Sequence, residues 1–193
     1  MGSTRFTTRT TVEIALTIAL AFILDELRLF QMPQGGSISL GMMPLIVLAL
    51  LRGPFVGVIA GGLFGVVDVI TEMQFIVHPA QFILDYPLPY ALVGLAGIMR
   101  QAWTHVLATR STTIAVLRAL VPAVVVGASL RYLSHLASGV IFFGEYAPQG
   151  QPVVLYSALY NLYVPVSAAA CLVAAAIILP VLSRVPGIQG SGE

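Results

Sequence analysis

Long apolar stretches separated by short polar turns are the feature that most restricts how this chain can fold. Of its 193 residues, 58% are apolar and 9% are charged, and the mean hydropathy is +0.96. Soluble domains carry about 25% charged residues, so this chain cannot cover a water-facing surface. Within a bilayer every backbone polar group needs a partner inside the protein, which leaves helices as the spanning elements for stretches of this kind. The sequence therefore predicts an all-α integral membrane protein.

Six apolar segments predict six transmembrane helices in a single membrane domain over residues 1–193, because a span needs about 20 apolar residues. A signal peptide is an alternative for the first segment, but Asp25 and Glu26 stand where a cleavage site needs small residues. Residues 100–112 are expected to form a polar loop or a surface helix, and residues 184–193 a small, polar, disordered tail. The expected helices cover about 11–29, 38–51, 54–71, 82–99, 113–143 and 153–182.

Charged residues are unevenly divided between the two ends of these helices. With a cytoplasmic N-terminus, seven of the nine arginines fall on the cytoplasmic side, as the positive-inside rule favours. Six of the eight carboxylates fall in the outer half, and an acidic mouth favours a cation that approaches from outside. Simple avoidance of the arginine side by acids explains this second bias equally well. Both termini are expected to be cytoplasmic.

The composition also excludes several kinds of chemistry. The chain has no lysine, which excludes a phosphate-binding P-loop and therefore ATP hydrolysis by that mechanism. Its three histidines, its carboxylates and its single cysteine, Cys171, show no zinc-ligand spacing. A net charge of +1 argues against nucleic acid as a partner. We expect no catalytic residue, no metal and no cofactor.

Polar residues enter four of the predicted helices at a similar depth near their outer ends. Charged groups at such depths cost a few kcal/mol unless they are paired or face water. A water-accessible pocket that opens to the outside is the simplest explanation, although Arg131 could instead pair structurally with Asp85 or Asp68. The residues concerned are Asp68, Asp85, Tyr86, Arg131, His135, Tyr156, Tyr160 and Asn161.

Two details of the backbone bear on this pocket. Pro87 and Pro89 remove hydrogen-bond donors, and the irregular backbone that results is tolerated only beside a cavity or other protein. Tyr156 and Asn161 lie about 140° apart around an ideal helix. Both can therefore reach one cavity only if the helix is irregular there or if the cavity wraps around it.

Small residues recur at helical spacing in two of the segments. Gly57, Gly61 and Gly65 form a ridge that predicts a close helix contact inside the bundle. Ala15 and Ala19 form a similar pair in the first helix. Internal packing is the simpler explanation for this alanine pair when it is considered alone.

Four motifs, in this order along the chain, resemble those of the thiamine-specific S-components of energy-coupling factor (ECF) transporters. They are MPQGGS at 32–37, HPAQFILDYP at 78–87, RYLSHLASG at 131–139 and YSALYN at 156–161. The resemblance covers about residues 11–182. It implies a six-helix bundle in a prokaryotic cell membrane that binds thiamine near the outer surface. It also implies delivery of the vitamin together with a transmembrane scaffold subunit and two ATPases.

The same resemblance implies a role for particular residues. Asp85 is expected to bond the aminopyrimidine, and the adjacent Tyr86 to reach the hydroxyethyl side of the ligand. His135 is expected to lie against the thiazolium ring. Tyr156 and Asn161 would complete the hydrogen bonds to the pyrimidine.

This chain also departs from the family pattern. Family members often carry Trp in the loops, whereas this chain has none in its first outer loop and has Phe143 before its last helix, where Phe143 is expected to contact the ligand. Its one tryptophan, Trp103, falls on the cytoplasmic side. Asp85 is one methylene shorter than the Glu of some relatives. The resemblance also implies that the small-residue motif of the first helix, here Ala15 and Ala19, contacts the scaffold subunit.

Three alternatives remain open. The ligand could be a related pyrimidine or another vitamin. The chain could be a solitary secondary transporter coupled to protons through Asp85, His135 and Asp68. An intramembrane enzyme is the third, although the sequence has no HExxH, GxSxG or paired catalytic Asp motif.

Overall fold

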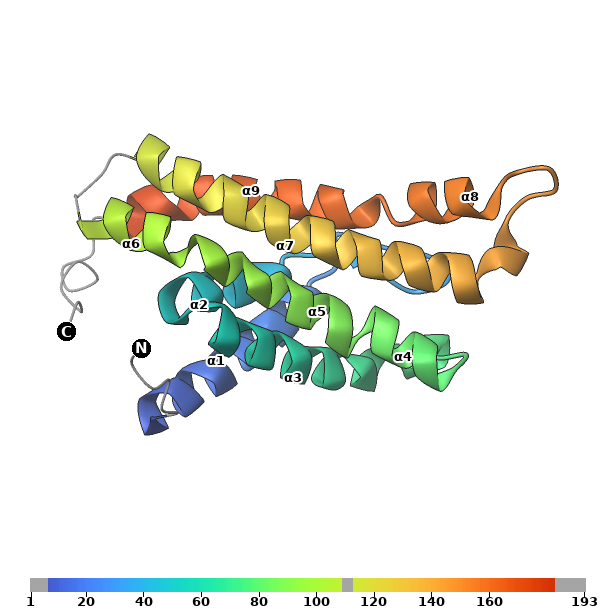
Figure 1. The fold of residues 1–193 in the computed structure, drawn as a ribbon, viewed down its shortest axis with the longest axis horizontal. Coiled ribbons are helices and arrows are strands. Elements are labelled where there is room, and N and C mark those ends of the chain that lie inside the picture. Colours follow the sequence, from blue (N-terminus) through green and yellow to red (C-terminus); the bar gives the residue numbers. More distant parts are fainter. Residues whose placement is uncertain (1–6, 109–112, 183–193) are drawn as a thin grey trace.

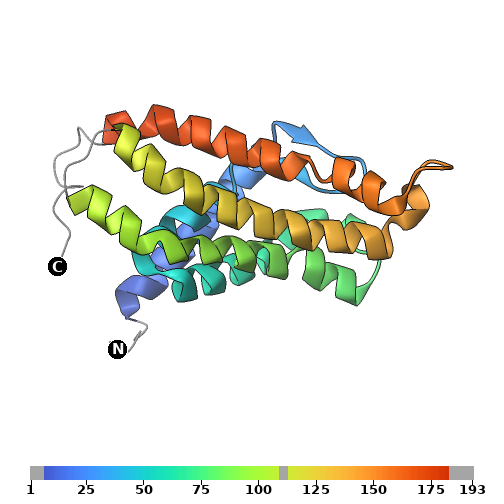
Figure 2. The ribbon, with the colours of Figure 1, turned by 45° about the horizontal axis from the view of Figure 1, so that its top comes forward.

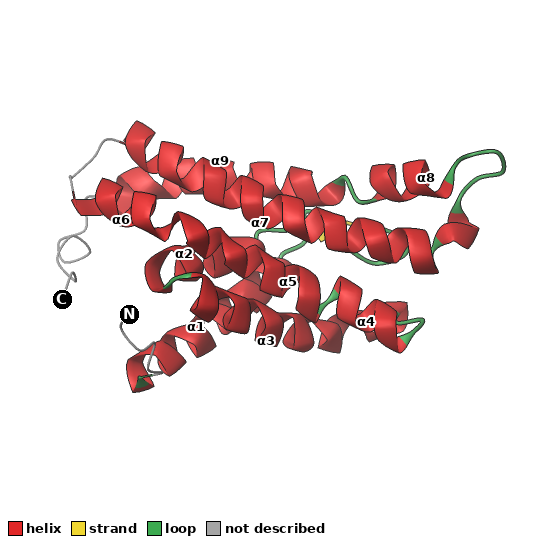
Figure 3. Ribbon diagram, viewed as in Figure 1, coloured by secondary structure: helices red, strands yellow, loops and turns green. Residues whose placement is uncertain are grey.

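The computed structural model describes residues 7–108 and 113–182, and most of these residues are helical (Figures 1 and 3). The α-helices are α1 (Thr8–Glu26), α2 (Met42–Arg52), α3 (Pro54–Glu72), α4 (Pro79–Asp85), α5 (Pro87–Val93), α6 (Arg100–Ala108), α7 (Thr113–Phe142), α8 (Val153–Tyr160) and α9 (Tyr163–Leu182). Short 3-10 turns are η1 (Met73–Phe75), η2 (Gly94–Met99) and η3 (Gly144–Tyr146). A small antiparallel hairpin joins β1 (Phe30–Gln31) to β2 (Ser37–Ile38).

Four stretches of the described chain are long and apolar enough to cross a bilayer, which confirms a multi-pass helical membrane protein. They are Pro54–Glu72, Pro79–Val106, Ile114–Phe142 and Val153–Ile178. Six spans require α1 and α2 as well, but α2 has only 11 residues and α1 carries three carboxylates. The expected polar tail at 184–193 lies outside the described residues.

α3, the stretch from α4 to α6, α7, and the stretch from α8 to α9 run roughly along the long axis of the molecule, whereas α1 runs obliquely to it (Figures 1 and 2). α3 packs against α5, and α7 packs against both α5 and α9. α6 and the start of α7 lie at one end of the bundle, whereas α4 and α8 lie toward the other end (Figure 1). The short hairpin runs beside α9, where it covers part of the middle of the bundle (Figure 2).

The fourth expected helix is a composite of α4, α5, η2 and α6. It breaks at Tyr86, whose φ of −120° and ψ of −80° are not helical. Pro87 and Pro89 lack the N–H groups that would continue the hydrogen-bond ladder, so the predicted irregularity is confirmed. The hydroxyl of Ser134 on α7 donates to the carbonyl oxygen of Leu84 (2.7 Å) and satisfies one backbone group at the break.

The fourth helix is also longer than the sequence indicated at both ends. It begins at Pro79, whose position at the first helical turn suits its missing N–H and fixed φ. Residues 100–108 continue it as α6, and the Trp103 side chain there is buried, so this part of the expected loop or surface helix packs into the bundle.

The glycine ridge of α3 makes the close contact that its spacing predicted. A Cβ atom on Gly61 would overlap the carbonyl oxygen of Tyr90, and one on Gly65 would overlap that of Tyr86. Gly57 meets the backbone of η2 in the same way. The ridge thus brings α3 directly against the backbone of the broken helix.

The end of the bundle around α6 carries basic side chains. The guanidinium of Arg52 forms an ion pair with the carboxylate of Glu13, which also accepts a hydrogen bond from Arg9 Nε (3.1 Å). Arg100 Nε donates to the carbonyl oxygen of Leu51 (3.1 Å). These contacts tie α1, α2 and α6 together at the end away from α4 and α8.

Candidate ligand-binding pocket

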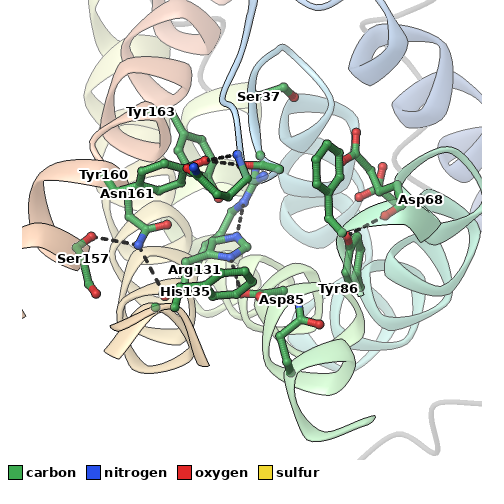
Figure 4. A pocket seen from close by; sticks show the side chains of 18 of the residues that line it. Ser37, Asp68, Asp85, Tyr86, Arg131, His135, Ser157, Tyr160, Asn161 and Tyr163 are labelled. Atoms are coloured by element: carbon green, nitrogen blue, oxygen red, sulfur yellow. Dashed lines mark hydrogen bonds and ion pairs between the residues drawn. The ribbon is translucent and has the colours of Figure 1, made fainter. Parts of the chain in front are cut away.

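A cavity of about 720 Å³, including its open mouth, lies among α3, α4, α7, α8 and the hairpin (Figure 4). The cavity is lined by Asp25, Gln34, Gly35, Gly36, Ser37, Asp68, Glu72, Phe75, Gln81, Asp85, Tyr86, Tyr90, Arg131, His135, Gly139, Phe143, Tyr156, Ser157, Tyr160, Asn161 and Tyr163.

All six residues that the sequence nominated for ligand binding line this one cavity. They come from separate parts of the chain: the end of α4, the α4–α5 break, α7, the turn after α7, α8, and the turn after α8. The fold therefore assembles them from segments up to 76 residues apart, counted from 85 to 161. They are Asp85, Tyr86, His135, Phe143, Tyr156 and Asn161.

Asp85 is held in place by donors from two helices. Its Oδ2 atom accepts hydrogen bonds from Ser138 Oγ (2.6 Å) and from Gln81 Nε2 (2.7 Å), one turn earlier on α4. Its Oδ1 atom lies 3.0 Å from His135 Nδ1. A carboxylate has about four acceptor positions. Three are used here, and one remains for a group in the cavity.

His135 is held in a single orientation by its two ring nitrogens. Arg131 Nε donates to His135 Nε2 (3.4 Å), so that nitrogen is an acceptor and the proton of the neutral ring lies on Nδ1, where it is donated to Asp85. Arg131 also donates to Tyr90 Oη (3.1 Å), and its guanidinium carbon lies 4.5 Å from the centre of the Tyr90 ring. The sequence left open an ion pair of Arg131 with Asp85 or Asp68. Arg131 instead bonds Tyr90 and His135.

Asn161 reaches the cavity from the end of α8. α8 ends at Tyr160 and α9 begins at Tyr163, but the backbone N–H of Asn161 still donates to the carbonyl oxygen of Ser157 (3.1 Å), so Asn161 keeps the helical register of Tyr156. The Asn161 amide nitrogen donates to the carbonyl oxygens of Ser157 (2.8 Å) and His135 (3.4 Å). Its amide oxygen points into the cavity as an acceptor (Figure 4). Tyr156 and Asn161 therefore both line the cavity because it extends around the side of α8.

Aromatic rings form much of the remaining wall. The Tyr156 and Tyr160 rings lie 5.9 Å apart. Phe143, Tyr90 and Tyr163 also line the cavity. Tyr86 is buried, and its hydroxyl donates to the carbonyl oxygen of Glu72 (3.2 Å). Flat, electron-rich faces of this kind suit a planar cation.

The tip of the hairpin closes one side of the cavity. The Tyr160 hydroxyl accepts a hydrogen bond from the backbone N–H of Gln34 (2.8 Å) and donates to the carbonyl oxygen of Gly35 (3.1 Å). Gly36 has a φ of +85°, and a Cβ atom there would collide with the Tyr163 ring. Only glycine permits both this backbone conformation and this close approach.

A group of carboxylates lies on the wall opposite Asn161 (Figure 4). Asp25 Oδ1 accepts from Ser39 Oγ (2.5 Å), while Glu72 Oε1 forms an ion pair with Arg28 (2.5 Å). Asp68 is 5% exposed. The described residues nevertheless contain no group of three or more His, Cys, Asp or Glu side chains arranged to hold a metal ion.

Several lining residues were not among the nominated six. Ser138 could have been found, because it follows His135 by three residues and so shares its helix face. Gln81 could have been found in the same way, because it precedes Asp85 by four residues and so shares its helix face. Glu72 and Asp25 reach the cavity only through the packing of α1 and α3, which the local sequence does not indicate.

Ala15 and Ala19 lie apart from the cavity on the exposed face of α1. Neighbouring apolar side chains on that helix, among them Val12, Leu16 and Leu20, are at least half exposed. The structure therefore contradicts internal packing as the explanation for this small-residue pair, because nothing within the described chain covers it.

The fold and this site define a class: a multi-pass helical membrane protein with a polar, aromatic-walled pocket at one end of its bundle. The chain belongs to the thiamine transporter protein family (Thia_YuaJ), whose model matches residues 11–186. This membership confirms the resemblance seen in the four motifs at the level of the thiamine transporter family.

Individual relatives agree with this assignment. The chain is 38% identical to the thiamine transporter ThiT of Bacillus subtilis over 152 residues, 78% of this chain and 79% of that protein. It is 31% identical to ThiT of Lacticaseibacillus paracasei over 127 residues, 64% and 63% of the two chains. The solved structure of ThiT from Listeria monocytogenes superposes with a TM-score of 0.78 at 28% identity, covering 93% of this chain and 96% of that one.

Proposed function

We propose that this chain is the high-affinity thiamine-binding membrane subunit of an ECF-type importer, without enzymatic activity of its own. The supporting observation is that the six nominated residues line one cavity whose polar groups match an aminopyrimidine. The free acceptor position of Asp85 and the amide oxygen of Asn161 can accept from its amino group. The Tyr156 hydroxyl can donate to a ring nitrogen.

The cationic half of thiamine suits the rest of the cavity. A thiazolium ring carries a fixed positive charge, which His135, held neutral between Asp85 and Arg131, does not repel. Tyrosine and phenylalanine faces contribute about 0.5–2 kcal/mol each to such a ring. We assign His135 and Phe143 to this half of the ligand.

The position of the pocket supports capture from outside the cell. The pocket carries four carboxylates, whereas the opposite end of the bundle carries Arg9, Arg52 and Arg100. The positive-inside rule assigns the basic end to the cytoplasm, so the pocket opens outward in a prokaryotic plasma membrane with six spans and cytoplasmic termini.

Delivery of the vitamin requires partners. We propose that Ala15 and Ala19, exposed on α1, contact a transmembrane scaffold subunit, and that two ATPases supply the energy. Small residues permit such close helix contact in the bilayer.

Isothermal titration of the purified, detergent-solubilised protein with thiamine, in the absence of ATP, tests the binding function. We expect saturable 1:1 binding, and Asn161→Ala should weaken it by about 1–3 kcal/mol because a ligand donor loses its partner. Glu145→Gln, an exposed change outside the cavity, is the control and should leave binding unchanged. Absence of heat with the folded wild-type protein would reject the proposal.

The hydrogen-bonded Asp85–His135 pair is the one observation that favours a solitary proton-coupled transporter. Liposomes that contain only this chain distinguish the two functions. A pH gradient should drive no thiamine uptake if the chain is an ECF subunit. Sustained uptake driven by that gradient would establish the proton-coupled transporter instead.

A further inference from the structure

The acidic wall of the cavity contains buried oxygens without hydrogen-bond partners. Asp68 and Glu72 are 5% and 6% exposed, and Asp68 Oδ1 and Glu72 Oε2 have no partner among the described residues. Both residues line the cavity, as does the nearby Asp25. Buried polar atoms are normally paired. The donors Arg131 Nη1 and Arg28 Nε also lack partners within the described chain, so the two acceptors point to a missing donor only together with the excess of carboxylates over guanidinium groups on the lining.

The charges on this wall limit what that donor can be. Among the described lining residues, four carboxylates face a single guanidinium, that of Arg131. Arg28 is not among the lining residues and forms ion pairs with Glu26 and Glu72. Carboxylates only accept hydrogen bonds. A neutral O–H or N–H group satisfies them, whereas an anionic group meets net repulsion from the carboxylates, which salt screens less at partly buried groups than at exposed ones.

The ligand's orientation follows from the opposite wall. Asn161 and Asp68 lie on opposite sides of the cavity, with Asp85 and Tyr86 between them (Figure 4). If Asp85 and Asn161 hold the aminopyrimidine, the other end of thiamine, its hydroxyethyl group, points toward Asp68 and Glu72. Tyr86, bonded to the Glu72 carbonyl, then lies beside the same end.

We propose that Asp68 and Glu72 form a selectivity site that accepts the terminal alcohol of thiamine and rejects its phosphate esters. This inference rests on the proposed function, because it takes the orientation of the ligand from it. Asp68 acts by charge and by hydrogen-bond acceptance, not by size. Replacement of its carboxylate by an amide of the same shape should therefore relax the selectivity.

Titration calorimetry of the full chain in detergent tests the site with three ligands. They are thiamine, thiamine monophosphate and a thiamine analogue whose hydroxyl is replaced by hydrogen. We expect the wild type to bind the phosphate ester and the deoxy analogue at least about tenfold more weakly than thiamine. Asp68→Asn should reduce the ratio of the phosphate-ester Kd to the thiamine Kd by about threefold or more, and Glu72→Gln provides a second variant should the first not fold. Glu145→Gln, matched in charge change and outside the cavity, should keep the wild-type ratio.

The outcomes separate this inference from the proposed function. Wild-type protein that binds thiamine and its monophosphate equally well would overturn the selectivity site and leave the thiamine-binding function standing. An unchanged ratio in a folded Asp68→Asn or Glu72→Gln protein would do the same, because it would make the discrimination steric. Absence of binding of all three ligands would overturn both.

Discussion

Replacement of Asp85 by Asn tests the central contact of the proposed site with almost no change in shape. The carboxylate accepts hydrogen bonds from Ser138, Gln81 and His135 and keeps one acceptor position for the ligand. A hydrogen bond to a charged group contributes about 1.5–3 kcal/mol, which corresponds to about a 10- to 150-fold change in Kd. We therefore expect the thiamine affinity of Asp85→Asn to fall within that range.

The same substitution should also lower stability, since the amide NH₂ turns one acceptor oxygen into a donor that faces other donors. Leaving one such buried group unpaired costs about 1–3 kcal/mol. Thermal unfolding, followed by fluorescence of the buried Trp103 far from the cavity, measures this loss separately from binding. Saturating thiamine shifts the unfolding temperature only in a protein that still binds it.

Calorimetry with thiamine at 25 °C is the deciding assay for this substitution. Asp85→Glu is the matched variant, since it keeps the charge while moving it by one methylene, and it should retain more affinity than Asp85→Asn. A folded Asp85→Asn protein with wild-type affinity would refute the reasoning. It would show that the fourth acceptor position of Asp85 does not contact the ligand.

Three further predictions concern the hairpin, the exposed face of α1 and the packing of α3. Tyr160→Phe removes both hydrogen bonds to the hairpin tip. We expect faster thiamine release in stopped-flow measurements and binding weakened by about 1–3 kcal/mol. An unchanged release rate would mean that these hydrogen bonds do not hold the hairpin in place. Ala15→Trp and Ala19→Trp should leave thiamine binding in calorimetry intact yet abolish cellular thiamine uptake, because a large side chain there blocks contact with the scaffold subunit. Normal uptake would mean that the scaffold subunit contacts another surface. Gly61→Ala should lower the free energy of unfolding by about 1–3 kcal/mol, because the added Cβ overlaps the backbone of Tyr90. Gly62→Ala is the control and should not, since its added Cβ would meet its nearest neighbour at 3.8 Å. Equal unfolding temperatures of the two variants would contradict the close packing of α3.

Features that depend on neighbouring residues could be predicted from the sequence. Apolar runs of spanning length follow from composition alone, because lipid requires both apolar side chains and internally bonded backbone. The break near Pro87 and Pro89 follows from their missing N–H groups. The contact of Gly61 with another helix follows from small residues at helical spacing.

The candidate site was accessible from the sequence only in part. Polar residues such as Asp85 and His135 stand out in apolar helices because their burial is costly without partners. Motif resemblance, and not geometry, supplied their expected roles. Which atoms they bond, and that Arg131 bonds Tyr90 and His135 in place of a carboxylate, depended on how α4, α5 and α7 pack.

The sequence by itself determined the class of protein, the presence of long apolar helices and the residues that have to avoid lipid, because these depend on local composition and spacing. Only the tertiary structure decided that the hairpin tip reaches Tyr160 and that the chain turns at Asn161. The same holds for Asp68 and Glu72, whose unpaired oxygens share a cavity with residues from α7 and α8. These arrangements depend on contacts between segments distant in the chain, and no local pattern specifies which distant partner a side chain will meet.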